Sequence, residues 1–184
     1  MNELVLVAGL MSYAAMAVTV RRHFAAMTWP RAAKATRVVS DLGVIAFVWL
    51  MWRAHHPVPS LAISLLLFAT CLALLFWTAK ATRSLRLRVA FDPASPGRVM
   101  RAGPYRFIRH PFYTSYVLFW LACAVATLHP ISLGFLIVVA AINVTAARRE
   151  ERAFAGSAFA ADYQDYCRTA GMFWPRFVAV AGRQ

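Results

Sequence analysis

The sequence is poor in charged residues, and acidic residues are especially scarce. Only 15% of the 184 residues are charged, and 7 Asp and Glu residues stand against 20 Lys and Arg residues, which gives a formal net charge of +13. Soluble domains usually contain about 25% charged and about 45–50% apolar residues, whereas this chain is 61% hydrophobic. The composition therefore excludes a disordered chain and argues against a soluble globular protein.

Cysteine is scarce as well. The three cysteines, Cys71, Cys123 and Cys167, lie far apart in the sequence, and the first two fall inside long apolar segments. They provide neither a disulfide framework nor the close spacing of a metal site. We therefore expect a protein without structural disulfides and without a bound metal ion.

Long apolar segments are the main feature of the sequence. A transmembrane helix needs about 20 mostly apolar residues, and five segments approach or reach that length. They are Leu4–Val20, Leu42–Trp52 (longer if Val38–Asp41 join it), Leu61–Ala79, Tyr113–Leu128 and Ile131–Ala147. The last two are separated by His129-Pro130, which suits a helical hairpin because proline does not continue a preceding helix. The sequence thus predicts an all-α integral membrane protein with five transmembrane helices.

The basic residues alternate with these spans. Every Lys and Arg except Arg53 lies between the first and second spans, between the third and fourth, or after the fifth. By the positive-inside rule these segments face the cytoplasm, which places the N-terminus outside and the C-terminus in the cytoplasm. Contacts with anionic membrane lipids explain the positive charge, and since no base-reading motif accompanies it, nucleic acid is not an expected partner.

The chain is predicted to divide into a scaffold and a functional part. Residues 1–80 contain three of the predicted spans and form a membrane scaffold. Residues 81–184 contain a long cytoplasmic connection, the helical hairpin and a C-terminal tail. Connections of this length are usually functional or disordered, and we expect this one to contribute to a cytoplasmic pocket.

The tail has the pattern of an amphipathic helix. Phe159, Tyr163 and Tyr166 recur at spacings of four and three residues, which places their rings on one face of a helix. We expect this helix to run from Phe154 to about Trp174. Its aromatic face would pack as a lid over the cytoplasmic connection and the end of the fifth span.

Two polar motifs lie at the predicted cytoplasmic ends of the hairpin. Residues 101–113, before the fourth span, mix aromatic residues, cations, a histidine and two prolines. Glu150 and Glu151 follow the fifth span among several arginines. Composition alone is compatible with an interfacial aromatic belt and with a solvated helix end whose ion pairs are weak. The functional alternative is a pocket whose carboxylates hold a cationic or hydroxyl-rich ligand.

In their order, sidedness and spacing, these motifs resemble those of the isoprenylcysteine carboxyl methyltransferase family, and the related phospholipid N-methyltransferases share the general pattern. The resemblance covers about residues 81–177. It rests on Gly103-Pro104-Tyr105, Arg109-His110-Pro111-x-Tyr113, Glu150-Glu151 and Phe159-x3-Tyr163-x2-Tyr166. The chain has Ser115 and Ala160 at two positions where the family often has glycine.

The resemblance implies a membrane methyltransferase whose cofactor is S-adenosyl-L-methionine. It assigns ten residues to the cofactor site, namely Gly97, Arg98, Val99, Met100, Tyr105, His110, Pro111, Phe112, Tyr113 and Glu150. It also implies an arginine that faces the substrate, for which Arg149 and Arg148 are the candidates. His110 is, in addition, the only residue of the motifs with the usual pKa of a general base.

The expected methyl acceptor is lipophilic and enters the site from the membrane lipids. A carboxylate of the isoprenylcysteine type is favoured, and being ionised it would need no general base, whereas an amine or a thiol would need one. A phospholipid or a small thiol is the alternative acceptor. A sterol-reductase-like NADPH enzyme and a non-catalytic membrane scaffold or transporter are the alternatives outside methyl transfer.

Overall fold

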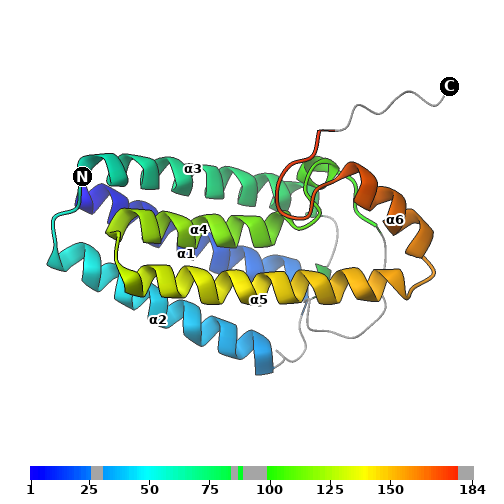
Figure 1. Cartoon of the computed structure of the whole chain (residues 1–184), viewed down its shortest axis with the longest axis horizontal. Coiled ribbons are helices and arrows are strands. Elements are labelled where there is room, and N and C mark those ends of the chain that lie inside the picture. The colour runs from blue at the N-terminus through cyan, green and yellow to red at the C-terminus, as the bar shows by residue number, and fades with distance from the viewer. Residues whose placement is uncertain (26–30, 84–86, 89–98, 178–184) are drawn as a thin grey trace.

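The computed structural model describes residues 1–25, 31–83, 87–88 and 99–177. Its α-helices are α1 (Asn2–His23), α2 (Arg31–Arg53), α3 (Val58–Ala81), α4 (Pro111–Thr127), α5 (Pro130–Ala155) and α6 (Ala160–Thr169). A short 3-10 helix, η1 (Gly103–Arg106), precedes α4, and the two-residue strands β1 (Phe24–Ala25) and β2 (Leu87–Arg88) pair in parallel. Five long helices form a bundle, and α6 lies at one end of it (Figure 1). The predicted helical fold is confirmed.

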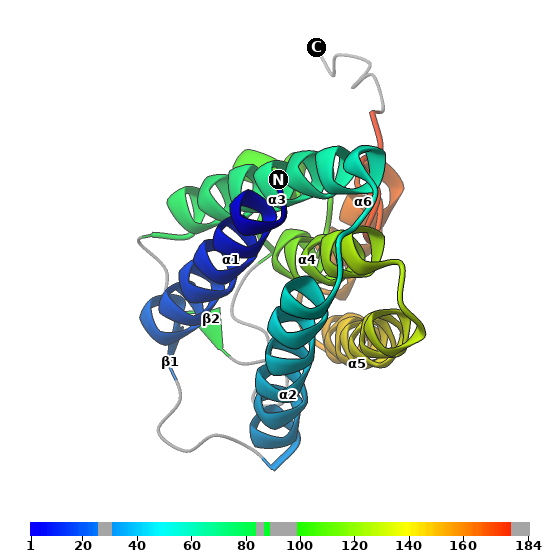
Figure 2. The ribbon, with the colours of Figure 1, turned by 90° about the vertical axis from the view of Figure 1, so that its left-hand side faces the viewer.

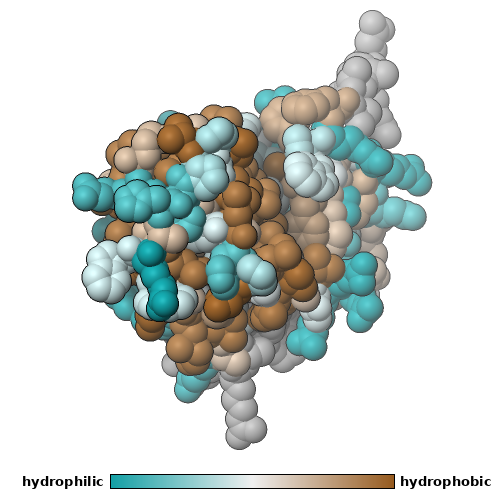
Figure 3. Space-filling view, turned by 60° about the vertical axis from the view of Figure 1, so that its left-hand side comes forward, coloured by the Kyte–Doolittle hydropathy of each residue, from teal (hydrophilic) through white to brown (hydrophobic). Residues whose placement is uncertain are grey.

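Four of the described helices, α1, α2, α3 and α5, are long and apolar enough to cross a membrane. Helix α4 is also apolar but has only 17 residues, or about 25 Å of helix, against a hydrocarbon core about 30 Å thick. Large apolar side chains such as Ile45, Leu66 and Ile137 are exposed, and apolar residues cover much of the face in Figure 3. An apolar surface of this extent belongs in lipid, so the chain is an integral membrane protein.

Helix α4 lies at the centre of the bundle, with the other long helices around it (Figure 2). Phe119 is fully buried and its ring centroid lies 5.7 Å from that of Phe68 on α3. Trp120 stacks on Phe135 of α5 at 5.7 Å. A Cβ atom at Gly43 of α2 would lie 2.3 Å from the Trp120 ring, so glycine is required for the close approach of α2 to α4. This packing fixes the position of α4, which has the polar motif at its start.

The long helices run alternately up and down the bundle. The N-terminus lies at one end, and the start of α4, the end of α5, η1 and α6 lie at the other (Figure 1). The elements that the sequence analysis placed on one side of the membrane therefore gather at one end of the bundle. The two polar motifs, which are about 40 residues apart in the sequence, meet there.

Helices α5 and α6 differ in extent from the segments expected from the sequence. Helix α5 continues to Ala155, eight residues beyond the end of the predicted span at Ala147, because the charged residues that follow the apolar segment are good helix formers and no glycine interrupts them before Gly156. Helix α6 begins at Ala160 instead of at Phe154, which belongs to α5, and it ends at Thr169 instead of near Trp174. The chain leaves the helix there because Gly171 pairs with the backbone before α4.

Candidate functional site

The C-terminal segment is attached by backbone hydrogen bonds to the residues that lead into α4. The Arg109 amide donates to the Gly171 carbonyl at 2.8 Å, and the Gly171 amide donates to the Phe107 carbonyl at 2.9 Å. The His110 amide donates to the Met172 carbonyl at 3.2 Å. A Cβ atom at Gly171 would lie 2.1 Å from the Trp174 carbonyl oxygen, so the tight turn needs glycine. These contacts hold Arg109 and His110 in fixed positions facing α5.

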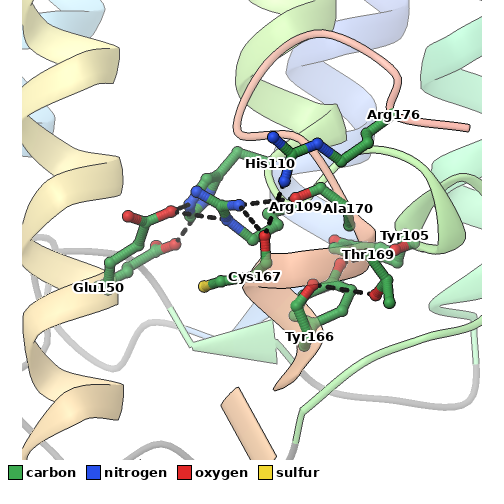
Figure 4. A network of polar contacts seen from close by, with 10 residues as sticks. Tyr105, Arg109, His110, Glu150, Tyr166, Cys167, Thr169, Ala170 and Arg176 are labelled. Carbon is green, nitrogen blue, oxygen red and sulfur yellow. Dashed lines mark hydrogen bonds and ion pairs between the residues drawn. The ribbon is translucent and has the colours of Figure 1, made fainter. Parts of the chain in front are cut away.

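His110 lies between two glutamates of α5. Its Nδ1 is 3.3 Å from Glu150 Oε2, and its Nε2 is 3.1 Å from Glu151 Oε1 (Figure 4). Only 8% of the residue is exposed. A neutral imidazole carries one N–H, and here both nitrogens face carboxylate oxygens, so the geometry fits the doubly protonated form. Burial alone would lower the pKa of His110, but the hydrogen bonds to Glu150 and Glu151 outweigh burial and raise that pKa.

Arg109 connects the same end of α5 to the end of α6. Its Nε donates to Glu151 Oε1 at 3.0 Å, and its Nη1 donates to the carbonyl oxygens of Ala170 at 2.6 Å and Cys167 at 3.4 Å (Figure 4). The side chains of Arg109 and Glu151 are 13% and 23% exposed. The two cations Arg109 and His110 thus balance the two carboxylates in a shielded cluster. Such a balance limits the cost of burying the charges.

Two tyrosines lie next to Glu150. The Tyr113 hydroxyl donates to Glu150 Oε1 at 2.7 Å, and the Tyr113 ring stacks on His110 with centroids 5.6 Å apart. Burial raises the pKa of Tyr105, and the charge of Glu150 raises it further, followed by the neighbouring Tyr166 and Tyr116. The phenol of Tyr105 therefore lies within electrostatic range of the Glu150 carboxylate. Glu150 thus accepts a hydrogen bond from one phenol and has a second phenol within electrostatic range, while its own side chain stays 30% exposed.

Helix α6 packs on this cluster through its aromatic face. Tyr163 and Tyr166 are buried, and the ring of Tyr163 stacks on Phe154 of α5 with centroids 4.6 Å apart. The Tyr166 hydroxyl donates to the Tyr105 carbonyl at 2.7 Å (Figure 4). Arg101 lies over the Tyr166 ring, 5.6 Å from its centroid, and donates to the Asp162 carbonyl at 2.8 Å. The aromatic spacing in the tail thus corresponds to a helix that covers the polar motifs.

The comparison with protein families gives one match. Residues 59–162, more than half of the chain, match the family model described as phospholipid methyltransferase. The chain belongs to the phospholipid methyltransferase family. The match covers α3, α4, α5 and the start of α6, so it contains the whole cluster around His110 and Glu150. No curated protein and no solved structure matches the chain significantly.

The structure of this phospholipid methyltransferase family member brings together four residues that the sequence analysis singled out, Tyr105, His110, Tyr113 and Glu150. Pro111 and Phe112 are buried at the start of α4. Val99 packs against the Tyr163 and Tyr166 cluster, and Met100 is half-buried. Gly97 and Arg98 lie outside the described residues.

The two candidate substrate arginines lie outside the cluster. Arg148 and Arg149 are exposed on α5, with no hydrogen bond or ion pair to any residue that the structure describes. The sequence analysis did not assign roles to Arg109 and Glu151, although both take part in the ion-pair cluster. The sequence did point to these two residues, because Arg109 directly precedes His110 and Glu151 directly follows Glu150.

The cluster shows no features of a metal centre. Among the described residues, no group of three or more His, Cys, Asp or Glu side chains is arranged to hold a metal ion. Both nitrogens of His110 are used in contacts with glutamates. The described side chains of the cluster offer hydrogen bonding by a carboxylate and by phenols, and aromatic contact with a ligand.

Proposed function

We propose that the chain transfers a methyl group from S-adenosyl-L-methionine to the carboxylate of a lipophilic acceptor of the isoprenylcysteine type. The observation that carries this proposal is the position of His110 between Glu150 and Glu151. A histidine whose two nitrogens both contact carboxylates has no free nitrogen to accept a proton. A site without a free histidine base suits an acceptor that is already ionised better than one that must first lose a proton.

The residues around Glu150 fit the cofactor that methyltransferases of this family generally use. Glu150 accepts a hydrogen bond from Tyr113 and remains partly exposed, so its oxygens can accept further hydrogen bonds from hydroxyl or ammonium groups. The rings of Tyr105 and Tyr113 can attract a cation or lie against an aromatic base. We propose that these three residues hold the cofactor, together with the chain before η1 and with His110 as the residue that positions Glu150.

The protein's part in the reaction is to bind and align the two reactants. When bound, S-adenosylmethionine supplies a methyl group that is already activated by a positively charged sulfur. Alignment and exclusion of water are then the main contributions required of the chain. Helix α6 and the hydrogen-bonded segment after it cover the cluster and support this role. Arg148 or Arg149 would orient the acceptor carboxylate through a bidentate contact.

We place the site at the cytoplasmic face of the membrane. The support is the distribution of basic residues, which, with the exception of Arg53, occupy alternate segments between the helices. The N-terminus and the cluster lie at opposite ends of the bundle (Figure 1). Five spans, with α4 as the shortest, would account for both features. The acceptor would enter sideways from the lipid.

A phospholipid amine is the second candidate acceptor. It is supported by the matching family model, which is described as phospholipid methyltransferase. An amine must lose a proton before or during transfer, and the charged form of His110 cannot take it. A small thiol would have the same requirement. The family assignment favours methyl transfer over the NADPH-dependent reductase and over the scaffold or transporter.

The acceptor can be identified with cofactor that carries a labelled methyl group. Purified protein would be incubated with N-acetyl-S-farnesyl-cysteine or with phosphatidylethanolamine vesicles, and the Glu150→Ala variant would serve as the inactive control. We expect base-labile label in the farnesylated cysteine, as in a methyl ester. Label found only in the amine of the lipid would show that the acceptor is an amine and not a carboxylate. No label in either probe would overturn the proposed acceptor classes.

A further inference from the structure

The hydroxyl of Tyr116 is buried and has no hydrogen-bond partner among the residues that the structure describes. Tyr116 lies on α4 and packs against the apolar core of the bundle. A buried polar atom without a partner destabilises a folded protein, and phenylalanine would fill the same space without that cost. The hydroxyl therefore needs an explanation outside the fold itself.

The position of Tyr116 points to the reaction site. It is one helical turn after Tyr113, and the two ring centroids are 6.4 Å apart. The phenols of Tyr105 and Tyr116 are close enough to interact electrostatically, and the Tyr105 hydroxyl also makes no hydrogen bond to a described residue. Two phenol groups without a hydrogen-bond partner among the described residues thus lie near the Tyr113 and Glu150 pair.

The neighbouring polar groups already have partners. Glu150 accepts from Tyr113 and contacts His110. Cys71 of α3, an electrostatic neighbour of Tyr116, donates to the Ser115 carbonyl at 3.2 Å. In the arrangement that the structure shows, none of these groups lies within hydrogen-bond distance of the Tyr116 hydroxyl. The missing partner is more simply supplied by a ligand.

We propose that Tyr116 is a specificity-determining residue that donates a hydrogen bond to the carboxylate of the methyl acceptor. This inference rests on the proposed function. The cofactor is water-soluble and approaches from the loop end, whereas Tyr116 lies deeper in the bundle, where a lipophilic acceptor would enter. A phenol O–H is a strong donor to a carboxylate, and more so in an apolar environment. Tyr105 would add a second donor from η1.

The test compares Tyr116→Phe with Tyr166→Phe in the full-length protein. Tyr166 is a matched control because its hydroxyl is already bonded, to the Tyr105 carbonyl. For each variant, three quantities are measured: the affinity for S-adenosylhomocysteine, the thermal midpoint of unfolding, and KM for N-acetyl-S-farnesyl-cysteine. In Tyr116→Phe we expect unchanged affinity, a thermal midpoint at or above that of the wild type, and KM raised about 5-fold or more, as for the loss of one hydrogen bond. In Tyr166→Phe we expect a lower thermal midpoint.

Three results would overturn the inference. An unchanged KM in Tyr116→Phe would show that the hydroxyl does not contact the acceptor. A thermal midpoint that falls as in Tyr166→Phe would show that the hydroxyl is satisfied within the protein, for example by a buried water. If the wild type methylates phosphatidylethanolamine but not the farnesylated cysteine, the carboxylate contact is wrong. Failure of the wild type to bind S-adenosylhomocysteine would instead remove the proposed function, and this inference with it.

Discussion

The Tyr113 hydroxyl donates a hydrogen bond of 2.7 Å to Glu150, and this contact joins the first turn of α4 to the last turns of α5. His110 stacks beside Tyr113 and contacts the same carboxylate. The orientation of Glu150 is therefore set by two side chains from the start of α4. We place the cofactor at this carboxylate, and a change in its hydrogen bonds should change cofactor affinity.

Tyr113→Phe removes one hydrogen bond to Glu150 and keeps the aromatic ring. We expect the affinity for S-adenosylhomocysteine to fall about 5-fold. A hydrogen bond to a charged group contributes about 1.5–3 kcal/mol, and only part of this contribution affects the binding of the cofactor. Titration calorimetry measures the effect. Tyr13→Phe is the matched control, since the Tyr13 hydroxyl contacts Asp41 between α1 and α2, and there the affinity should not change. Equal affinities in both variants would argue against a role for Tyr113.

The stability of the protein should fall as the pH rises, because of His110. The pKa of His110 in the folded protein lies above the value of about 6.5 for an unfolded chain, so protonation of His110 stabilises the fold. This contribution is complete below about pH 6.5 and is lost as the pH rises through the pKa of the folded protein. His110→Gln cannot titrate and should lack this loss. The thermal midpoints of the wild type and of His110→Gln are measured from acid to alkaline pH. The same pH dependence in both proteins would contradict the assignment.

Arg109 and Glu151 should contribute to stability as a pair. They form a shielded ion pair at 3.0 Å, and Arg109 also bonds to the carbonyls of Ala170 and Cys167. In a double-mutant cycle with alanine at both positions, we expect a coupling free energy of about 1–3 kcal/mol. Unfolding of the four proteins in mixed micelles measures it. Additive effects of the two substitutions would show that the pair is not coupled.

Gly43→Ala should destabilise the bundle without a direct effect on the site. The added methyl group would meet the Trp120 ring at 2.3 Å, so α2 must move away from α4, at a cost of about 1–3 kcal/mol. Gly134→Ala is the control on a neighbouring helix, because a Cβ atom there has open space around it. The thermal midpoints of both variants test the prediction. A midpoint for Gly43→Ala equal to that of Gly134→Ala would contradict the close packing.

The parts of the fold that depend on local sequence could be predicted. The apolar segment Leu61–Ala79 lies within α3 (Val58–Ala81), and the spacing of Tyr163 and Tyr166 corresponds to the buried face of α6. Both follow from periodicity and length. Helix α5 extends beyond the predicted span Ile131–Ala147 because hydropathy falls after Ala147, although helix propensity does not. Hydropathy reports the membrane boundary, which differs from the helix boundary.

The contacts that build the candidate site could be predicted only in part. Tyr105, His110, Tyr113 and Glu150 came from the resemblance of their motifs to a family. The ion pair of Arg109 with Glu151 joins residues 42 positions apart, and no periodicity in the sequence encodes such a distance. The end of α6 depends in the same way on the pairing of Gly171 with the chain before α4. Long-range pairing of this kind requires the folded structure.

The most direct test of a cofactor site at Glu150 is calorimetric titration of the detergent-purified protein with S-adenosylhomocysteine, for the wild type and for Glu150→Ala. We expect the wild type to bind and the variant to bind about 10-fold more weakly or not at all, a change of about 1.4 kcal/mol or more. His110→Ala should show a similar loss, because His110 positions the carboxylate. Wild-type affinity in both variants would contradict the proposed site, and absence of binding in the folded wild type would contradict the methyltransferase proposal itself.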